Sequence, residues 1–496
     1  MKAMMPALAM LLMAASPVVT IDSGALRGAE AEGIASFKGI PYAAVPIGPL
    51  RWHAPEPAAP WQGVREATAL GNDCFQVRLP GDVANTDQPQ SENCLFLNVW
   101  TPKPQAGAKL PVMVWIHGGG FTNGSGGAAI LDGSRLAARG VVVVTFNYRL
   151  GRFGFFAHPA LTKESGAAPT GNWGLMDQIA ALQWVKRNIA AFGGDPGNVT
   201  IFGESAGGES VNRLMTSTAA RGLFAKAIVS SGGGRNSWPS LAEAEAKGVT
   251  FAKDAGVAGD DLTALRAIPA ETVLGKINFI NSDEARYSGP ITDGRIVTGD
   301  TDVLFAAGRQ ARIPYVVGSN SDELGFIPVP FLAGFNAKTT AELGAGAEAV
   351  RAAYGSQAAY DRNIASDVTF TEPALALARR HAKVAPAWLY RFGYVAEAKR
   401  KPDLGASHAT DVPYQFDNLD KIGAPVSAAD QAVAKALADR WVRFAKTGDP
   451  GWPRFAGAAP VKLSIGNDKA ERVPAAEPPI AAIERVRDAA KQGDAK

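Results

Sequence analysis

The 496-residue sequence has little of what marks a metal-dependent, nucleic-acid-binding or membrane-spanning protein. It contains two cysteines and five histidines, and the histidines form no His-x-x-x-His cluster, so we expect no metal site. Fifty basic against 47 acidic side chains leave a net charge of +3, which is too balanced for a nucleic-acid-binding surface. No stretch of 18 or more apolar residues occurs, so we also expect no stable membrane insertion.

The N-terminus has the plan of a secretory signal peptide. Lys2 precedes an apolar run, 7–15, which is too short to span a bilayer and ends in small residues. We therefore expect residues 1–16 to be a signal peptide, with the cleavage position left open, and the protein to be exported to the periplasm or secreted. In an exported protein the pair Cys74 and Cys94 favours one disulfide.

The remaining chain, 17–496, contains no linker and no internal repeat, and we expect it to form one domain. Short β-rich runs alternate with longer Ala/Leu-rich segments, a pattern typical of a parallel sheet covered by helices. Apolar residues at helical spacing predict a crossover helix over 174–190. The predicted strands are 111–117, 141–147, 199–203, 225–230, 313–319 and 386–392.

Two long regions, 236–310 and 327–385, lack the strand pattern, and we expect helices there that are inserted over a pocket. The Gly/Ala-rich stretch 333–348 and the Pro-rich stretch 449–479 are interpreted as loops.

A Gly-x-Ser-x-Gly string, 203–207, lies between a predicted strand and a segment that can open a helix. This context is typical of a nucleophilic serine in the α/β-hydrolase fold, whose mostly parallel sheet is flanked by helices. The glycines are needed because the serine sits on a tight turn with positive φ, where neighbouring Cβ atoms would clash. Ser205 is therefore the predicted nucleophile. A serine hydroxyl needs a histidine to accept its proton and a carboxylate to orient that histidine.

The order of the chain narrows the choice of partners, because in this fold the acid and then the histidine follow the serine. Of the two downstream histidines, His381 lies in a helix-like segment and is interpreted as a surface residue. His408 follows the last clear strand and is the predicted base. The acid is expected in the loop after the strand that ends at Ser319, where Asp322 and Glu323 both qualify. Spacing alone does not separate them.

A glycine-rich loop, 117–121, follows an early predicted strand with the sequence His-Gly-Gly-Gly-Phe. Residues without side chains allow backbone N–H groups to approach a developing oxyanion. The predicted donors are the N–H groups of Gly119, Gly120 and Ala206, and His117 is interpreted as a structural member of the loop. No phosphate-binding glycine pattern follows.

In these motifs the sequence closely resembles the type-B carboxylesterases, whose relatives include the cholinesterases and bacterial para-nitrobenzyl esterase-like enzymes. The resemblance extends from about Ser23 to about Pro453. The segments that carry it are 24–28, 37–43, 50–52, 91–99 and 192–207.

The resemblance implies specific roles. It selects Glu323 as the acid, although Leu324 stands where the family usually has glycine, and it supports His408 as the base. It implies that Glu204 either tunes the electrostatics of the pocket or forms a scaffold hydrogen bond, and that Ser231 is a structural residue near the site. The resemblance also implies a disulfide between Cys74 and Cys94 and two buried, structural ion pairs, Arg51–Glu92 and Arg149–Asp177.

The expected function is hydrolysis of small to medium apolar carboxylic esters through an acyl-enzyme, with no cofactor and a small-molecule ester as the partner. An alternative enzymatic function is hydrolysis of amides, carbamates or lactones by the same residues. An alternative non-enzymatic function is that of an adhesion or binding protein with the same fold. Phe121, Phe326 and Phe416 are candidates for the apolar lining of the pocket, or else for the core. The oligomeric state is left open.

Overall fold

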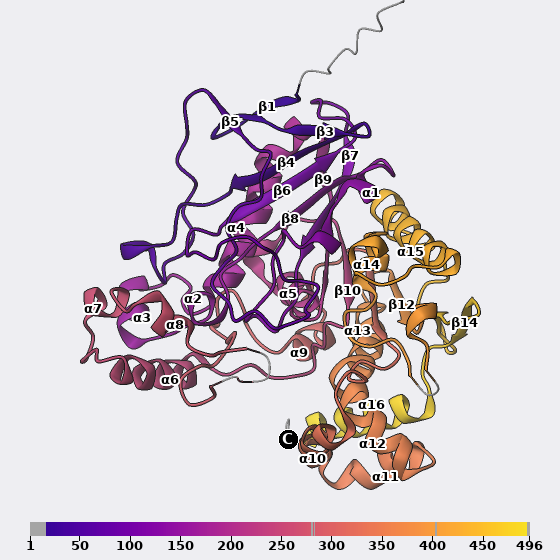
Figure 1. The fold of residues 1–496 in the computed structure, drawn as a ribbon. Helices are drawn as coiled ribbons and strands as arrows, with labels where there is room; N and C mark the ends of the chain where they lie inside the picture. The colour runs from indigo at the N-terminus through magenta and orange to yellow at the C-terminus, as the bar shows by residue number, and fades with distance from the viewer. Residues whose placement is uncertain (1–15, 279–280, 282, 402–403, 494–496) are drawn as a thin grey trace, which may run out of the picture.

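An 11-stranded sheet forms the centre of the computed structural model, which describes residues 16–278, 281, 283–401 and 404–493 (Figure 1). Its strand order is β14-β13-β12-β11-β10-β9-β7-β8-β6-β4-β3. From one edge to the other the strands are β14 (Ala470–Pro474), β13 (Val461–Ile465), β12 (Ala387–Phe392), β11 (Tyr315–Asn320), β10 (Lys226–Ser230), β9 (Gly194–Glu204), β7 (Leu110–Ile116), β8 (Val142–Phe146), β6 (Phe96–Thr101), β4 (Ile34–Pro41) and β3 (Ala29–Ala31).

The central strands, from β8 to β13, pair in parallel, and the pairs at both edges are antiparallel. Every residue of β8, β10 and β11 is buried, which explains why these strands appear in the sequence as nearly continuous apolar runs. All six predicted strands are present, and the predicted fold class is confirmed. A separate three-stranded sheet near the N-terminus contains β1 (Val18–Ile21), β2 (Gly24–Arg27) and β5 (Val64–Glu66).

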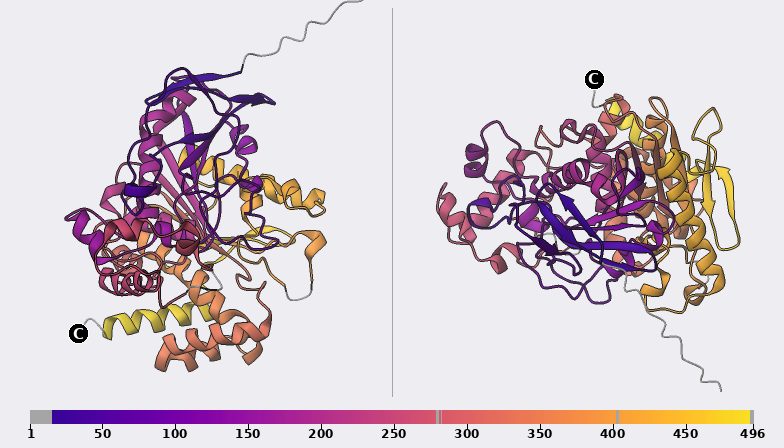
Figure 2. Two further views of the ribbon diagram at one scale, coloured as in Figure 1. Left: turned by 60° about the vertical axis from the view of Figure 1, so that its left-hand side comes forward. Right: turned by 90° about the horizontal axis from the view of Figure 1, so that it is seen from above.

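Helices cover both faces of the sheet (Figure 2). Strand β7 shows how the faces divide, because Val112 and Val114 belong to one apolar cluster and Met113 and Trp115 to the other. The first cluster includes side chains of α4 (Trp173–Asn188), α5 (Ala206–Thr216) and α13 (Glu372–His381). The second includes side chains of α1 (Ser134–Ala137), α14 (Val412–Gln415) and α15 (Ala428–Thr447). Helix α4 is the predicted crossover helix.

The two regions without a strand pattern are helical, as predicted. The elements of the first are α6 (Leu241–Asp254), α7 (Leu262–Arg266), α8 (Ala270–Leu274) and α9 (Thr301–Ala306). Those of the second, before α13, are α10 (Val329–Leu343), α11 (Ala347–Ala353), α12 (Gln357–Ser366) and a π-helical turn, η6 (Asp367–Thr371). Helices α10 to α12 form a lobe at one end of the molecule, with α16 (Pro478–Gly493) beside it (Figures 1 and 2). The remaining short helices are α2 (Gly151–Gly154) and α3 (Pro159–Ser165).

Two stretches interpreted as loops contain regular structure. Most of 333–348 belongs to α10, because alanine is the strongest helix former and the first glycine with positive φ, Gly344, follows the last helical residue. Within 449–479, β13 and β14 form an antiparallel pair that closes the sheet. The predicted signal peptide lies outside the described residues, except for Ser16. No helix in the described ranges is long and apolar enough to cross a membrane.

Candidate active site

Ser205 lies on a tight turn between β9 and α5. Its backbone has φ 56° and ψ −126°, a conformation that costs energy for a residue with a side chain. The turn also needs glycine nearby, because a Cβ on Gly207 would lie 2.0 Å from the carbonyl oxygen of Ile116. The predicted elbow is therefore present, with Ser205 directly before the N-terminus of α5.

His408 lies within hydrogen-bond distance of both other residues of the predicted triad. The Ser205 hydroxyl donates to Nε2 of His408 (2.8 Å), and Nδ1–H of His408 donates to Oε2 of Glu323 (2.6 Å). These two contacts orient both ring nitrogens, with Nδ1 facing the carboxylate of Glu323 and Nε2 facing the serine.

Other groups hold Glu323 in this position. Its second oxygen, Oε1, accepts from the backbone N–H of Asn320 and from the hydroxyl of Ser231, both at 2.6 Å. Ser231, interpreted from the sequence as structural, therefore contacts the acid directly. The competing carboxylate, Asp322, points elsewhere and accepts from Arg362 (2.5 Å).

The loops that carry these residues continue the hydrogen bonding of the parallel sheet. The N–H of Ser205 donates to Ser230 O (3.0 Å), and the N–H of Ser321 donates to Phe392 O (2.8 Å). The N–H of His408 in turn donates to the carbonyl oxygen of Glu323 (2.9 Å). Backbone bonds thus tie the serine turn to β10, the acid loop to β12 and the histidine loop to the acid loop, in addition to the side-chain contacts.

Glu204 is a second carboxylate at the site. Its Oε1 lies 3.2 Å from Nε2 of His408, the nitrogen that also contacts Ser205. Because Glu204 is buried, its pKa is raised well above the usual value for a glutamate. Burial acts to lower the pKa of His408, but the charges of Glu204 and Glu323 outweigh burial and raise this pKa above that of an ordinary histidine.

The glycine-rich loop passes directly against the elbow. A Cβ on Gly118 would lie 2.9 Å from the Cβ of Ser205, so the loop can approach this closely only without a side chain. Gly119 and Gly120 both have positive φ, 99° and 59°. Within the described residues, the N–H groups of Gly119, Gly120 and Ala206 donate to no acceptor of the chain. They are therefore available to an oxygen atom beside Ser205.

Several other predictions are decided by burial. The prediction that His381 lies at the surface is wrong, because the side chain is fully buried and its Nε2–H donates to Ile313 O (2.8 Å). Phe416 packs in the core against Phe202 and does not line a pocket. Phe121 is buried beside the glycine loop, and Phe326 is 52% exposed.

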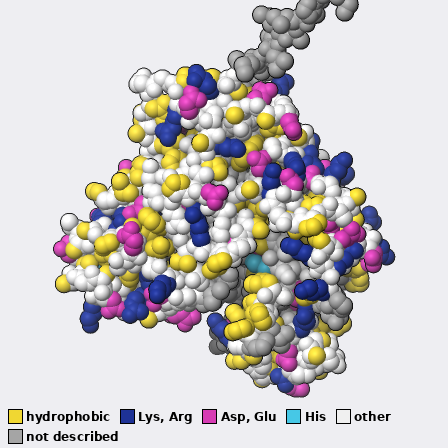
Figure 3. Space-filling view, in the orientation of Figure 1, with side chains coloured by type: hydrophobic (Ala, Val, Ile, Leu, Met, Phe, Trp, Pro, Cys, Tyr) yellow, Lys and Arg dark blue, Asp and Glu magenta, His cyan; other side chains and the backbone are white. Residues whose placement is uncertain are grey.

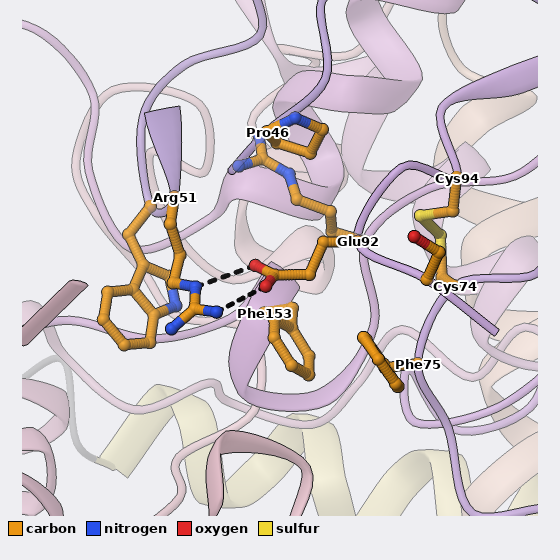
Figure 4. A pocket seen from close by; sticks show the side chains of 10 residues that line it. Pro46, Arg51, Cys74, Phe75, Glu92, Cys94 and Phe153 are labelled. Atoms are coloured by element: carbon orange, nitrogen blue, oxygen red, sulfur yellow. Dashed lines mark hydrogen bonds and ion pairs between the residues drawn. A yellow bond between two sulfur atoms is a disulfide. The ribbon is translucent and has the colours of Figure 1, made fainter. Parts of the chain in front are cut away.

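The predicted disulfide and ion pairs are present. Cys74 and Cys94 are bonded and line a cavity of about 10 Å³, together with the paired side chains of Arg51 and Glu92 (Figure 4). This cavity is no larger than one water molecule and is too small for an ester. The second ion pair, Arg149 with Asp177, lies fully inside the protein (2.8 Å).

Two neighbours of the triad had no signal in the sequence. Asp411 is fully buried, accepts from Asn320 (3.1 Å), and has a pKa that burial and the charge of Glu323 raise to about 6. Phe370, on the π-helical turn, places its ring centroid 4.7 Å from that of His408.

Figure 3 shows a histidine side chain at the floor of a hollow between the α6 side of the molecule and the lobe of α10 to α12.

Comparison with known proteins identifies the family of the chain. A model of the Carboxylesterase family matches residues 15–472. The chain belongs to the carboxylesterase family. Its relatives include a fumonisin B1 esterase of Sphingopyxis macrogoltabida, which is 38% identical over 467 residues that cover 88% of this chain and 84% of the relative. A para-nitrobenzyl esterase of Bacillus subtilis (strain 168) is 38% identical over 460 residues, covering 88% and 92%.

Solved structures resemble this carboxylesterase over nearly its whole length. A PNB esterase structure has a TM-score of 0.82 and 34% identity, covering 95% of this chain and 99% of that one. A thermophilic PNB esterase has a TM-score of 0.83 and 33% identity, covering 95% and 99%. A cocaine esterase of Oryctolagus cuniculus is 34% identical over 502 residues, covering 89% of this chain and 90% of the relative. The protein is a carboxylesterase, and the prediction of carboxylic ester hydrolysis is confirmed at this level.

Proposed function

We propose that this carboxylesterase hydrolyses its substrates with a Ser205–His408–Glu323 triad through a covalent acyl-enzyme. The observation that carries the proposal is the continuous relay from the serine hydroxyl through both nitrogens of His408 to Glu323, at 2.8 and 2.6 Å. A neutral imidazole in this orientation accepts the hydroxyl proton as the oxygen attacks the ester carbonyl. Glu323 then stabilises the imidazolium ion that forms.

The carbonyl oxygen becomes negatively charged during the attack and is stabilised by the N–H groups of Gly119, Gly120 and Ala206. One such donor contributes roughly 3–4 kcal/mol to the stability of the transition state. The free N–H groups of the glycine loop, which passes against Ser205, support this assignment.

Three proton transfers complete the reaction. His408 returns its proton to the alkoxy oxygen, the C–O bond breaks, and the alcohol leaves with Ser205 acylated. Water then gives a proton to His408 as its oxygen attacks the acyl carbon. His408 passes this proton to the oxygen of Ser205 as the bond between that oxygen and the acyl carbon breaks, which releases the carboxylic acid and restores the serine hydroxyl. No cofactor takes part in this cycle.

We propose small to medium apolar esters as substrates. The glycine loop supports this choice, because the half-buried ring of Trp238 packs edge-on against Phe121 of this loop (ring centroids 5.7 Å apart) and places aromatic surface beside it. A panel of esters graded by acyl length and alcohol bulk measures the preference. Matched p-nitrophenyl esters and p-nitroanilides measure the preference for esters over amides.

Labelling by a fluorophosphonate tests the triad. The wild-type protein is expected to take up one label, and Ser205→Ala to take up none while keeping its fold and disulfide. Turnover of Ser205→Ala is expected to fall by roughly 10⁴-fold or more. Labelling of the folded Ser205→Ala protein at the wild-type rate would overturn the assignment of the nucleophile.

We also propose that the enzyme is exported and that residues 17–496 form the mature single domain. The short apolar run behind Lys2 and the pair Cys74–Cys94 support export. Cell fractionation and N-terminal sequencing of the mature protein test it, and a cytoplasmic protein that retains Met1 would contradict it.

A further inference from the structure

Two side chains of α12 contact the loop that carries Glu323. Nη2 of Arg362 donates to Oδ2 of Asp322, the residue before the acid, at 2.5 Å. The hydroxyl of Ser366 accepts from the N–H of Leu324, the residue after it, at 3.1 Å. The acid is therefore held on both sides by one helix of the inserted lobe.

The next residue along the same face contacts the histidine loop. Phe370 follows Ser366 by four positions, and its ring packs on the ring of His408 with centroids 4.7 Å apart and planes inclined by 37°. One element therefore contacts two triad loops whose key residues lie 85 positions apart in the chain.

The π-helical turn η6 explains how residues 362, 366 and 370 share a face. In an α-helix a step of four residues rotates a side chain by about 40°, so two steps would carry position 370 well away from position 362. In η6 the N–H of Glu372 donates to the carbonyl oxygen of Asp367, an i→i+5 bond that widens the turn. A wider turn rotates less per residue and returns Phe370 toward this face. Single π-helical turns occur frequently at functional sites.

Further contacts fix this turn in place. Tyr354 donates to Asp367 (2.7 Å), and Arg487 of α16 donates to Val368 O (2.8 Å). Arg391 of β12 donates to the hydroxyl of Thr371. The position of Phe370 is therefore set by the lobe, by the C-terminal helix and by the sheet together.

We propose that Arg362, Ser366 and Phe370 form a positioning clamp that holds the acid loop and His408 in register, with Phe370 as its principal member. The proposal rests on the proposed function, because it takes His408 as the base. None of the three touches Ser205, so their effect is exerted through Glu323 and His408.

Phe370 positions His408 in two ways. The ring covers one face of an imidazole whose side chain is only 17% exposed, and so restricts both its rotation and its access to water. An aromatic face also attracts a cation at short range, which favours the imidazolium ion that forms during attack. A displacement of about 1 Å in such a group can lower a rate by about a hundredfold.

The test compares Phe370→Leu with Phe331→Leu. Leucine keeps apolar volume at position 370 and removes the aromatic ring, and Phe331 is a 69% exposed phenylalanine on α10 of the same lobe. We expect Phe370→Leu to lower kcat about tenfold with KM changed less than twofold, and Phe331→Leu to leave kcat unchanged. Arg362→Met and Ser366→Ala are expected to lower kcat less, and Phe370→Tyr to restore most of it.

Nuclear magnetic resonance provides a readout that a merely structural role would not move. The chain has only five histidines, so selective labelling of histidine gives a spectrum that Ser205→Ala and His408→Gln variants can assign. The resonance of His408 Cε1–H is expected to lose the ring-current shift of Phe370 in Phe370→Leu, and its titration midpoint is expected to fall. The other four histidines are expected to keep their resonances.

Two failures remain distinguishable. If the wild type takes up no fluorophosphonate, the proposed function itself is wrong. The clamp is refuted if wild type and Phe370→Leu are both labelled, their kcat values agree within twofold, and the titration midpoints of His408 in the two proteins agree within experimental error. Should Phe370→Leu not fold, Phe370→Met and Arg362→Met provide the same comparison.

Discussion

Replacing Glu204 by glutamine changes one charge beside the base while keeping the shape of the side chain. The carboxylate lies 3.2 Å from Nε2 of His408. At this distance two opposite unit charges attract by about 1.3 kcal/mol in a water-like dielectric and by about 5 kcal/mol at an effective dielectric constant of 20. One pKa unit corresponds to about 1.4 kcal/mol, so even the weaker limit amounts to about one unit.

The direction of the effect follows from the role of His408. Only the neutral imidazole accepts the proton of Ser205, and Glu204 together with Glu323 raises the pKa of His408 above its ordinary value of about 6.5. The acid limb of kcat/KM in the wild type is therefore expected above this value. Glu204→Gln removes the charge that Glu204 carries where it is ionised, so the limb is expected to move to lower pH, by about one unit at the weaker limit.

The assay measures kcat/KM for one p-nitrophenyl ester between pH 5 and 10, at the wavelength where p-nitrophenol and its anion absorb equally. Glu348→Gln is the matched control, because that side chain is 83% exposed and lies on α11, and its acid limb is expected to coincide with that of the wild type. An acid limb of Glu204→Gln that stays in place or moves to higher pH would refute this account of His408.

Three further changes have expected outcomes. Replacing Cys74 and Cys94 by serine opens a loop of 20 residues and is expected to lower the free energy of unfolding by about 3 kcal/mol, measured by urea denaturation under oxidising conditions. Gly119→Ala places a Cβ 2.1 Å from a backbone oxygen of its own loop and is expected to lower kcat by roughly 10²–10³-fold. Gly107→Ala, with a similar φ of 90° and no atom within 4 Å of the added Cβ, is its control and is expected to retain kcat. Arg149→Met leaves a buried carboxylate unpaired and is expected to destabilise the protein by roughly 3–5 kcal/mol in thermal or urea unfolding, and an unchanged midpoint would contradict this.

The tight turn that carries Ser205, the proposed nucleophile, could be predicted from the sequence because its constraints are local. A tight turn with positive φ requires glycines at fixed positions, and the strand before Ser205 and the helix after it are both continuous in the chain. The glycine loop could be predicted for the same reason, because its three consecutive glycines, Gly118 to Gly120, can be recognised in the sequence.

The proposed acid could not be selected from the local sequence pattern, because the choice between Asp322 and Glu323 depends on tertiary contacts. Asp322 and Glu323 are adjacent and chemically alike. In the structure Asp322 accepts a hydrogen bond from Arg362, and Glu323 accepts one from His408. The burial of His381 has a similar origin, because its carbonyl partner comes from a distant segment. Phe370 has no motif at all, since a π-helical turn leaves no recognisable spacing in a sequence.

The backbone bonds that continue the sheet beyond its strands have a consequence for how the enzyme loses activity. The amides of Ser205 and Ser321 are bonded to the carbonyl oxygens of Ser230 and Phe392, the last residues of β10 and β12, so their hydrogen exchange requires the sheet itself to open. Their exchange is therefore expected to be as slow as that of β10 and β11. We therefore expect no local unfolding of the active site at a lower free energy than global unfolding. Activity and the native fold are then expected to be lost at the same denaturant concentration.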